Sequence, residues 1–211
     1  MPYALKGEKV PDSFTLNQPK RTIVLDLETK RAFDGSDRSR LESLGVSVVG
    51  LYRYDTDKFE TYDESEFSRL STLLAQTELI VGFNINRFDL PVLQPHVKVP
   101  LRKVRAIDLL EEMRRVLGHR VSLNSVSRAT LGREKSGDGL QAIRLYQQGQ
   151  IDKLKRYCLD DVRLTREIYE HGCRHGQVVI PSRFGDERIP VTVTWGQAPE
   201  ETPRMQQQSL F

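Results

Sequence analysis

Short apolar runs separated by turn residues dominate the first half of the chain, and they predict a block of strands. The run Ile-Val-Leu within residues 22–28 predicts a buried strand. Residues 45–54 are rich in β-branched and aromatic side chains, and residues 58–62 follow a short Asp-Thr-Asp turn, so we expect these two segments to form a hairpin. Shorter apolar runs at residues 79–82 and 104–107 predict two further strands.

Apolar positions at helical spacing become more frequent after this block. Gly118 and Gly132 follow two amphipathic stretches and are expected to end helices there. The predicted helices cover residues 64–76, 88–93, 108–117, 122–131, 140–148 and 151–171, and strand-like residues 178–180 and 189–195 follow them. Early strands followed mostly by helices predict an α/β or α+β domain with a mixed sheet.

The composition changes at both ends of the chain. Residues 1–19 contain three prolines and little periodicity, so we expect an N-terminal extension. After Gly196 the sequence is mostly polar until its last two residues, which predicts a disordered tail at 196–211. The remaining residues, 20–195, have an ordinary size for one domain with its own core.

With 38% hydrophobic and 29% charged residues, the composition is that of a soluble globular protein. The net charge of +3, from 32 basic and 29 acidic residues, neither requires nor excludes a nucleic-acid partner. Cys158 and Cys173 form no Cys-x-x-Cys pair, which argues against a zinc site or a disulfide framework. No signal-peptide core and no apolar run near the roughly 20 residues that span a bilayer is found, so we expect a cytoplasmic protein without a membrane partner.

Two acids end the first predicted strand. Side chains two positions apart share one face of a strand, so Asp26 and Glu28 should project together while Leu27 points to the opposite face. Carboxylates held so close repel one another unless a cation lies between them, and oxygen ligands suit Mg²⁺ or Mn²⁺. Read alone, this pair is more simply a solvated strand end. A buried strand that ends in acids is, however, how α/β folds present a site at the carboxyl edge of a sheet.

Further acids occur in two later segments. Asp89 closes the segment Asn84-Ile-Asn-Arg-Phe-Asp89 at a predicted helix start, where it either joins a site or caps the helix. Tyr157 and Asp161 are four positions apart and would share one face of a helix, with Asp160 as a competing acid. Read alone, Tyr157 is a core aromatic and the two aspartates are a surface pair.

Three segments of the chain resemble the exonuclease motifs of the DEDD superfamily. They are Asp26-Leu-Glu28-Thr29, residues 82–89 and Tyr157-x-x-x-Asp161. The histidine subclass has its histidine five positions before the last acid, where this chain has Arg156, so the resemblance is to the tyrosine subclass. It covers about residues 20–180 and is strongest to the proofreading domains of family B DNA polymerases and to stand-alone bacterial relatives.

The resemblance implies an RNase H-like fold, in which a mixed β-sheet is flanked by α-helices, and a 3′→5′ exonuclease. Two divalent ions, Mg²⁺ or Mn²⁺, about 4 Å apart would clamp the scissile phosphate. The implied metal ligands are Asp26, Glu28, Asp89 and Asp161. Tyr157 would position the attacking water, Thr29 would lie near the 3′-hydroxyl, and Asn84 and Phe88 would lie near the terminal nucleotides.

Basic residues outside the motifs are candidates for holding the backbone of a single strand. We expect Arg133 and Lys135 to contact substrate, because they lie in a polar, glycine-rich segment and loops commonly carry adaptable contacts. Other basic candidates are Arg114-Arg115 with His119-Arg120, and Lys153 with Lys155-Arg156, although the first group also fits an ordinary solvated helix face. Asp108 opens a predicted helix, and capping that helix is its expected role, with support of the metal ligands as the alternative.

The last five residues, Gln-Gln-Ser-Leu-Phe, resemble the motif by which bacterial polymerases and repair factors bind the β sliding clamp. Leu210 and Phe211 would each gain roughly 1.5–3 kcal/mol if fully buried in a pocket, and Gln207 and Ser209 complete the motif. A clamp encircles DNA, so this resemblance favours single-stranded DNA ends as substrate, in replication or repair. The alternatives are an exoribonuclease of the same fold and a catalytically silent nucleic-acid-binding adaptor. An RNase H-type endonuclease would give no reason for the tyrosine motif.

Overall fold

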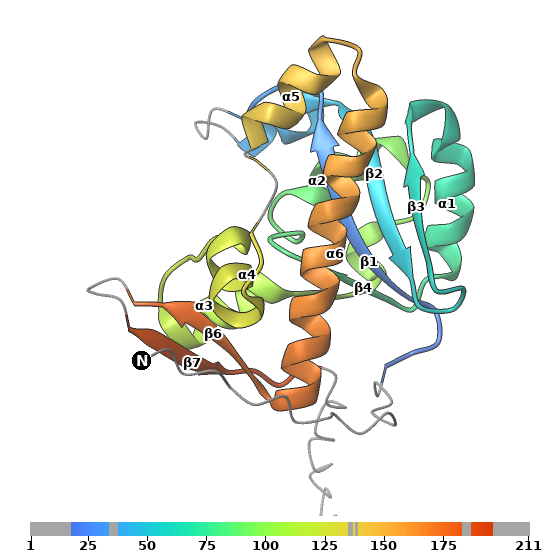
Figure 1. The fold of residues 1–211 in the computed structure, drawn as a ribbon. Helices are drawn as coiled ribbons and strands as arrows, with labels where there is room; N and C mark the ends of the chain where they lie inside the picture. Colours follow the sequence, from blue (N-terminus) through green and yellow to red (C-terminus); the bar gives the residue numbers. More distant parts are fainter. Residues whose placement is uncertain (1–17, 34–37, 135–136, 138, 183–186, 196–211) are drawn as a thin grey trace, which may run out of the picture.

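A computed structural model describes residues 18–33, 38–134, 137, 139–182 and 187–195 (Figure 1). Its main sheet has the strand order β3-β2-β1-β4-β5. The strands are β1 (Thr22–Thr29), β2 (Val46–Arg53), β3 (Lys58–Tyr62), β4 (Leu79–Gly82) and β5 (Arg105–Asp108). β1 pairs antiparallel with β2 and parallel with β4, so the sheet is mixed, as the sequence predicts.

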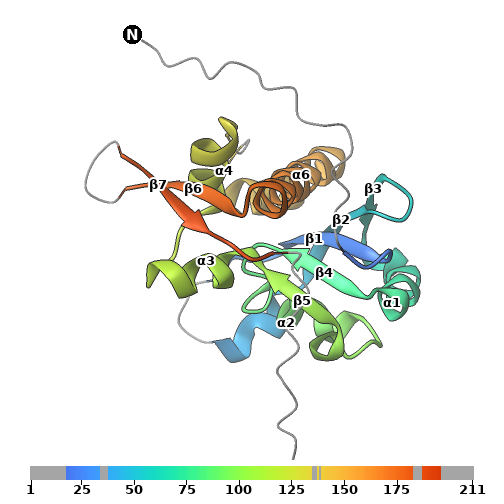
Figure 2. The same ribbon diagram turned by 90° about the horizontal axis from the view of Figure 1, so that it is seen from below.

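Helices cover both faces of this sheet. The α-helices are α1 (Phe67–Gln76), α2 (Asp89–Leu93), α3 (Leu109–Leu117), α4 (Leu123–Leu131), α5 (Gly139–Gln147) and α6 (Ile151–His175). Short 3₁₀ helices lie at η1 (Arg38–Leu44), η2 (Glu64–Glu66), η3 (Gln94–His96) and η4 (Leu101–Lys103). A second, antiparallel sheet is formed by β6 (Gln177–Pro181) and β7 (Arg188–Thr192). Figure 2 shows α6, α4 and the β6–β7 hairpin on one face of the main sheet, opposite α2.

Alternate residues of β1 face opposite sides of the sheet. The odd-numbered apolar residues Ile23, Leu25 and Leu27 pack in the buried cluster that includes residues of α1 and α2. Val24 instead packs with residues of α6 and β6. Asp26 and Glu28 follow Val24 at intervals of two, so β1 directs both acids to the face that α6 covers. The expected opposite orientation of Leu27 is confirmed by its place in the other cluster.

The helix α6 packs closely against the sheet at Gly50. This glycine lies opposite Asp26 in the register of β1 and β2. A Cβ atom at Gly50 would lie 2.7 Å from Cys158 Sγ and 3.1 Å from Val162 Cγ2, both on α6. The missing side chain therefore sets how near α6 comes to β1.

The end of α6 differs from the sequence prediction, which stopped this helix at residue 171. The helix continues to His175 and ends at Gly176, whose φ of 66° is left-handed. Gly172 lies inside the helix, and a Cβ there would be 2.3 Å from Trp195 Cε3. Gly172 is thus required by the packing of Trp195 and is not a stop signal. None of the helices in the described part of the chain is both long and apolar enough to cross a membrane.

Gly50→Ala should lower the free energy of unfolding by about 1–3 kcal/mol, because the new methyl group collides with Cys158 Sγ. Cys158→Ala removes that atom, so the double variant should lose less than the sum of the two single losses. A coupling of about 0.5–3 kcal/mol is expected from denaturant unfolding followed by circular dichroism. Strictly additive losses would show that α6 does not rest on Gly50.

Candidate active site

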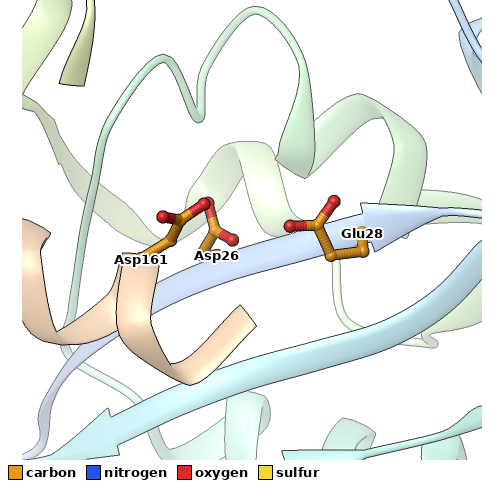
Figure 3. A group of neighbouring side chains, drawn as sticks. All are labelled: Asp26, Glu28 and Asp161. Atoms are coloured by element: carbon orange, nitrogen blue, oxygen red, sulfur yellow. The ribbon is translucent and has the colours of Figure 1, made fainter. Parts of the chain in front are cut away.

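Three acids from two distant segments meet above the sheet. Asp26 and Glu28 project from β1 and Asp161 from α6 (Figure 3), and each offers a carboxylate oxygen that lies within 4.8 Å of the others. Asp161 is buried, whereas Asp26 and Glu28 are partly exposed. Three carboxylates this close repel one another, and a divalent cation offsets the repulsion. A donor set made only of carboxylate oxygens fits Mg²⁺ or Mn²⁺ better than zinc or copper.

The side chain of Asp89 forms a hydrogen bond with the backbone of the same strand, β1. Asp89 is the first residue of α2, and its carboxylate accepts a hydrogen bond of 3.1 Å from the backbone N–H of Leu27, between Asp26 and Glu28. The parallel pairing of β1 with β4 ends at Val24, so Asp89 binds a part of β1 that β4 no longer pairs with. The N-cap position of α2 belongs to the preceding residue, so the alternative role of Asp89 as that cap is wrong.

Burial raises the pKa of Asp89 to about 7, and the nearby charges of Asp108 and Asp161 act in the same direction. The backbone N–H groups that Asp89 accepts from, including that of Leu27, only partly oppose this shift. A carboxyl held in this way stays protonated more readily than an ordinary aspartate unless a cation stabilises its charge.

The helix α6 presents only one of its two neighbouring aspartates to this cluster. Asp161 is 2% exposed, whereas the side chain of Asp160 is 40% exposed and pairs with Arg163 at 2.5 Å. Tyr157 lies one helical turn before Asp161, is buried, and packs with Val48 and residues of α5 and α6. The ring of Tyr157 is therefore part of the core, as the simpler interpretation expected.

A cavity of about 540 Å³ opens at the acids. It is lined by Asp26, Leu27, Glu28, Phe83, Asn84, Phe88, Asp89, Leu110, Arg120, Val121, Ser122, Leu123 and Asp161. The structure thus brings Asn84 and Phe88 together with all four expected acids. Thr29 and Tyr157 are not among the lining residues, and the Thr29 hydroxyl donates to the backbone carbonyl of Arg31 at 2.7 Å.

Asp108 organises one wall of this cavity. Its carboxylate caps α3 by accepting from the N–H groups of Leu110 and Glu111, which confirms the expected capping role. It also accepts from the N–H groups of Asn84 at 2.8 Å and Asn86 at 3.0 Å. The second pair of bonds fixes the turn after β4, where Asn84 has a left-handed φ of 67°. The sequence signal for this role is an acid directly after the strand predicted at residues 104–107.

One expected substrate residue, Arg133, is absent from the cavity lining. Arg133 is exposed and pairs with Glu167 on α6. Lys135 and the tail residues Gln207, Ser209, Leu210 and Phe211 lie outside the described residues. Arg120, one of several basic candidates in the sequence, is the residue that the structure places at the cavity.

A mixed sheet with flanking helices and acids gathered from its first strand and its last long helix is an RNase H-like arrangement. The chain belongs to the RNase H superfamily, whose family model matches residues 24–173.

Similar solved structures include the family B DNA polymerase from the hyperthermophilic archaeon Pyrobaculum calidifontis, at 21% identity and a TM-score of 0.56. The match covers 74% of this chain but only 25% of the polymerase chain, and it shows a shared fold. The Trypanosoma brucei RNase D complex with RNA U12 matches at 18% identity and a TM-score of 0.40, over 86% of this chain and 72% of that one. Comparison with curated proteins gave no match.

In metal-free protein, the contribution of Asp89 to stability should fall as the pH rises from about 4 to about 7. Burial raises the pKa of Asp89 to about 7, so over this range the folded state holds a proton that the unfolded chain has released. Asp89→Asn keeps an oxygen that can accept from Leu27 and cannot ionise, so it should flatten this pH dependence. Denaturant unfolding in EDTA at several pH values compares the two proteins. Parallel curves would refute the assignment to Asp89.

Proposed function

We propose that this protein is a metal-dependent 3′→5′ exonuclease that releases nucleotides from single-stranded DNA ends. The observation that carries the proposal is the approach of oxygens from Asp26, Glu28 and Asp161 to within 4.8 Å of one another at an open cavity. A cluster of this charge is unfavourable by itself, and it is suited to divalent ions beside an anionic substrate.

The described residues fit such ions. Asp26, Glu28 and Asp161 would hold them, and Asp89 is the fourth acid at the same cavity. When bound, the ions would supply Lewis acidity at the scissile phosphate and at the attacking water. Tyr157, one helical turn before Asp161, would orient that water or help to take its proton.

The remaining walls suit the end of a strand. A cavity of about 540 Å³ takes a ligand of nucleotide size. Phe88 lines it and offers an aromatic face on which a base can stack, as in other single-strand binding sites. These features support an exonuclease that accepts a frayed or single-stranded terminus. The preference for DNA over RNA and the 3′→5′ polarity rest on the motif and tail resemblances.

Asp26→Asn and Asp161→Asn should each reduce nucleotide release by more than about 100-fold, because each removes charge from the metal-holding cluster. Asp160→Asn on the exposed side of α6 is the matched control and should retain activity. Tyr157→Phe should slow hydrolysis and leave it measurable, since proton-transfer groups typically contribute about 10²–10⁴-fold. Full activity in either acid variant would overturn the site.

A cleavage assay tests the polarity of the reaction, the choice between DNA and RNA, and whether the protein hydrolyses the strand or only binds it. Time courses with Mg²⁺ or Mn²⁺ use single strands of DNA and RNA labelled at either the 5′ or the 3′ end. A ladder that shortens from the 3′ end on DNA supports the proposal as stated. Degradation of RNA alone would make the protein an exoribonuclease, and binding without hydrolysis would make it an adaptor.

We further propose that the tail docks on a DNA sliding clamp, on the strength of its sequence alone. Deleting residues 207–211 should leave hydrolysis of a short oligonucleotide unchanged and abolish binding to the purified β clamp. Replacing Leu210 and Phe211 by alanine should have the same effect, because these are the apolar groups that a pocket would bury. Surface plasmon resonance measures the binding, and undiminished binding by the deleted chain would rule the docking role out.

A further inference from the structure

One basic residue lines the cavity that holds the acids. Among the lining residues, four are acids and Arg120 is the single cation. In the described part of the chain Arg120 forms no salt bridge with any carboxylate, although it shares the cavity with four of them. Its guanidinium is therefore available to an anion that enters the cavity.

The position of this guanidinium is fixed by a chain of hydrogen bonds. Arg120 Nη2 donates to Asn84 Oδ1 at 2.9 Å, which leaves further N–H donors of the fork for a ligand. Asn84 is fixed in turn, because Asp108 accepts from the N–H groups of Asn84 and Asn86 on either side of the turn. The cation is thus preorganised by the sheet edge, which lowers the entropy lost on binding.

The surroundings of Arg120 match the parts of a nucleotide. Phe83, Val121 and Leu123 give the same cavity an apolar wall, and Ser122, which also lines it, is the N-cap of α4. A helix N-terminus and a guanidinium both favour a phosphate, and an apolar wall favours a base.

We propose that Arg120, held by Asn84, binds a backbone phosphate next to the terminal nucleotide of the strand in the cavity. This deepens the proposed function and rests on it. The acids and their ions would act on the scissile phosphate, whereas Arg120 would hold a different phosphate and so set the position of the strand. Arg120 is a substrate-binding residue in this assignment, and affinity depends on it more than the chemical step does.

The test measures binding apart from cleavage. A fluorescein-labelled DNA oligonucleotide is titrated by anisotropy into Asp26→Asn protein, with and without Arg120→Ala, at several salt concentrations. Arg120→Ala should weaken binding about 5–20-fold and should reduce the slope of log K against log salt by about 0.7, the value for one phosphate contact on a single strand. Arg69→Ala is the matched control, because Arg69 is exposed on α1 and pairs with Glu60 and Glu66. It should change neither quantity.

Neutral linkages identify the phosphate. Oligonucleotides with one methylphosphonate at each of the last three linkages are compared. At one linkage, the methylphosphonate should weaken binding to the protein with Arg120 and leave binding to Arg120→Ala unchanged. That linkage carries the phosphate that Arg120 contacts. In otherwise unsubstituted protein, Arg120→Ala should raise KM while kcat stays within about 3-fold, a pattern typical of lost uniform binding.

The outcomes separate this inference from the proposed function. Loss of affinity with an unchanged salt slope would mean that Arg120 only supports Asn84, and it would overturn the phosphate contact. Unchanged affinity in a protein that still cleaves would overturn the inference alone. If the unsubstituted protein neither binds nor cleaves any strand with Mg²⁺ or Mn²⁺, the proposed function and the inference both fail. Equal melting temperatures of the Arg120 and Arg120→Ala proteins would exclude misfolding as the cause of a loss.

Discussion

The site depends on the close approach of α6 to β1 and β2. The absence of a side chain at Gly50 lets Cys158 and Val162 of α6 rest on the sheet directly opposite Asp26. One turn along the helix, the same packing places Asp161 beside the strand acids. The apolar contact thus offsets the free energy needed to hold like charges together. A dense negative cluster requires such packing or bound cations, because carboxylates do not attract one another.

Asp89 and Asp108 show two opposite uses of a buried carboxylate. Asp89 accepts from Leu27 on β1, and burial raises its pKa to about 7, so its charged form is disfavoured. Asp108 is buried too, and burial also raises its pKa, but the backbone N–H groups of Asn86, Asn84 and Glu111 oppose that shift. A bound cation would favour the charged form of Asp89 and so change its protonation. Asp108 is a structural anchor for the turn that carries Asn84.

The regular elements could be predicted because local pattern determines them. Residues 58–62 were predicted as a strand and form β3 with those bounds, since the turn and alternating side chains are local signals. The end of α6 could not be predicted, because Gly172 reads as a stop until Trp195, more than 20 positions later, is seen to pack on it. In the site, the shared face of Asp26 and Glu28 follows from strand geometry. The choice of Asp161 over Asp160 needed the family resemblance, and the structure shows its burial.

The contact of Asp108 with the turn after β4 and the role of Arg120 could not be read from spacing, because both are tertiary. A helix cap is visible in sequence, but a carboxylate that also binds a turn 24 positions earlier is not. Arg120 belongs to a group of basic residues that fits an ordinary solvated face, and its contact with Asn84 and its place at the cavity set it apart. The distribution of charge in the cavity follows from this arrangement: negative groups come from β1, α2 and α6, and the one positive group comes from the segment before α4. In the proposed function, a bound strand would meet the acids at its reactive phosphate and Arg120 at another phosphate, so the separation of the two charges would orient it.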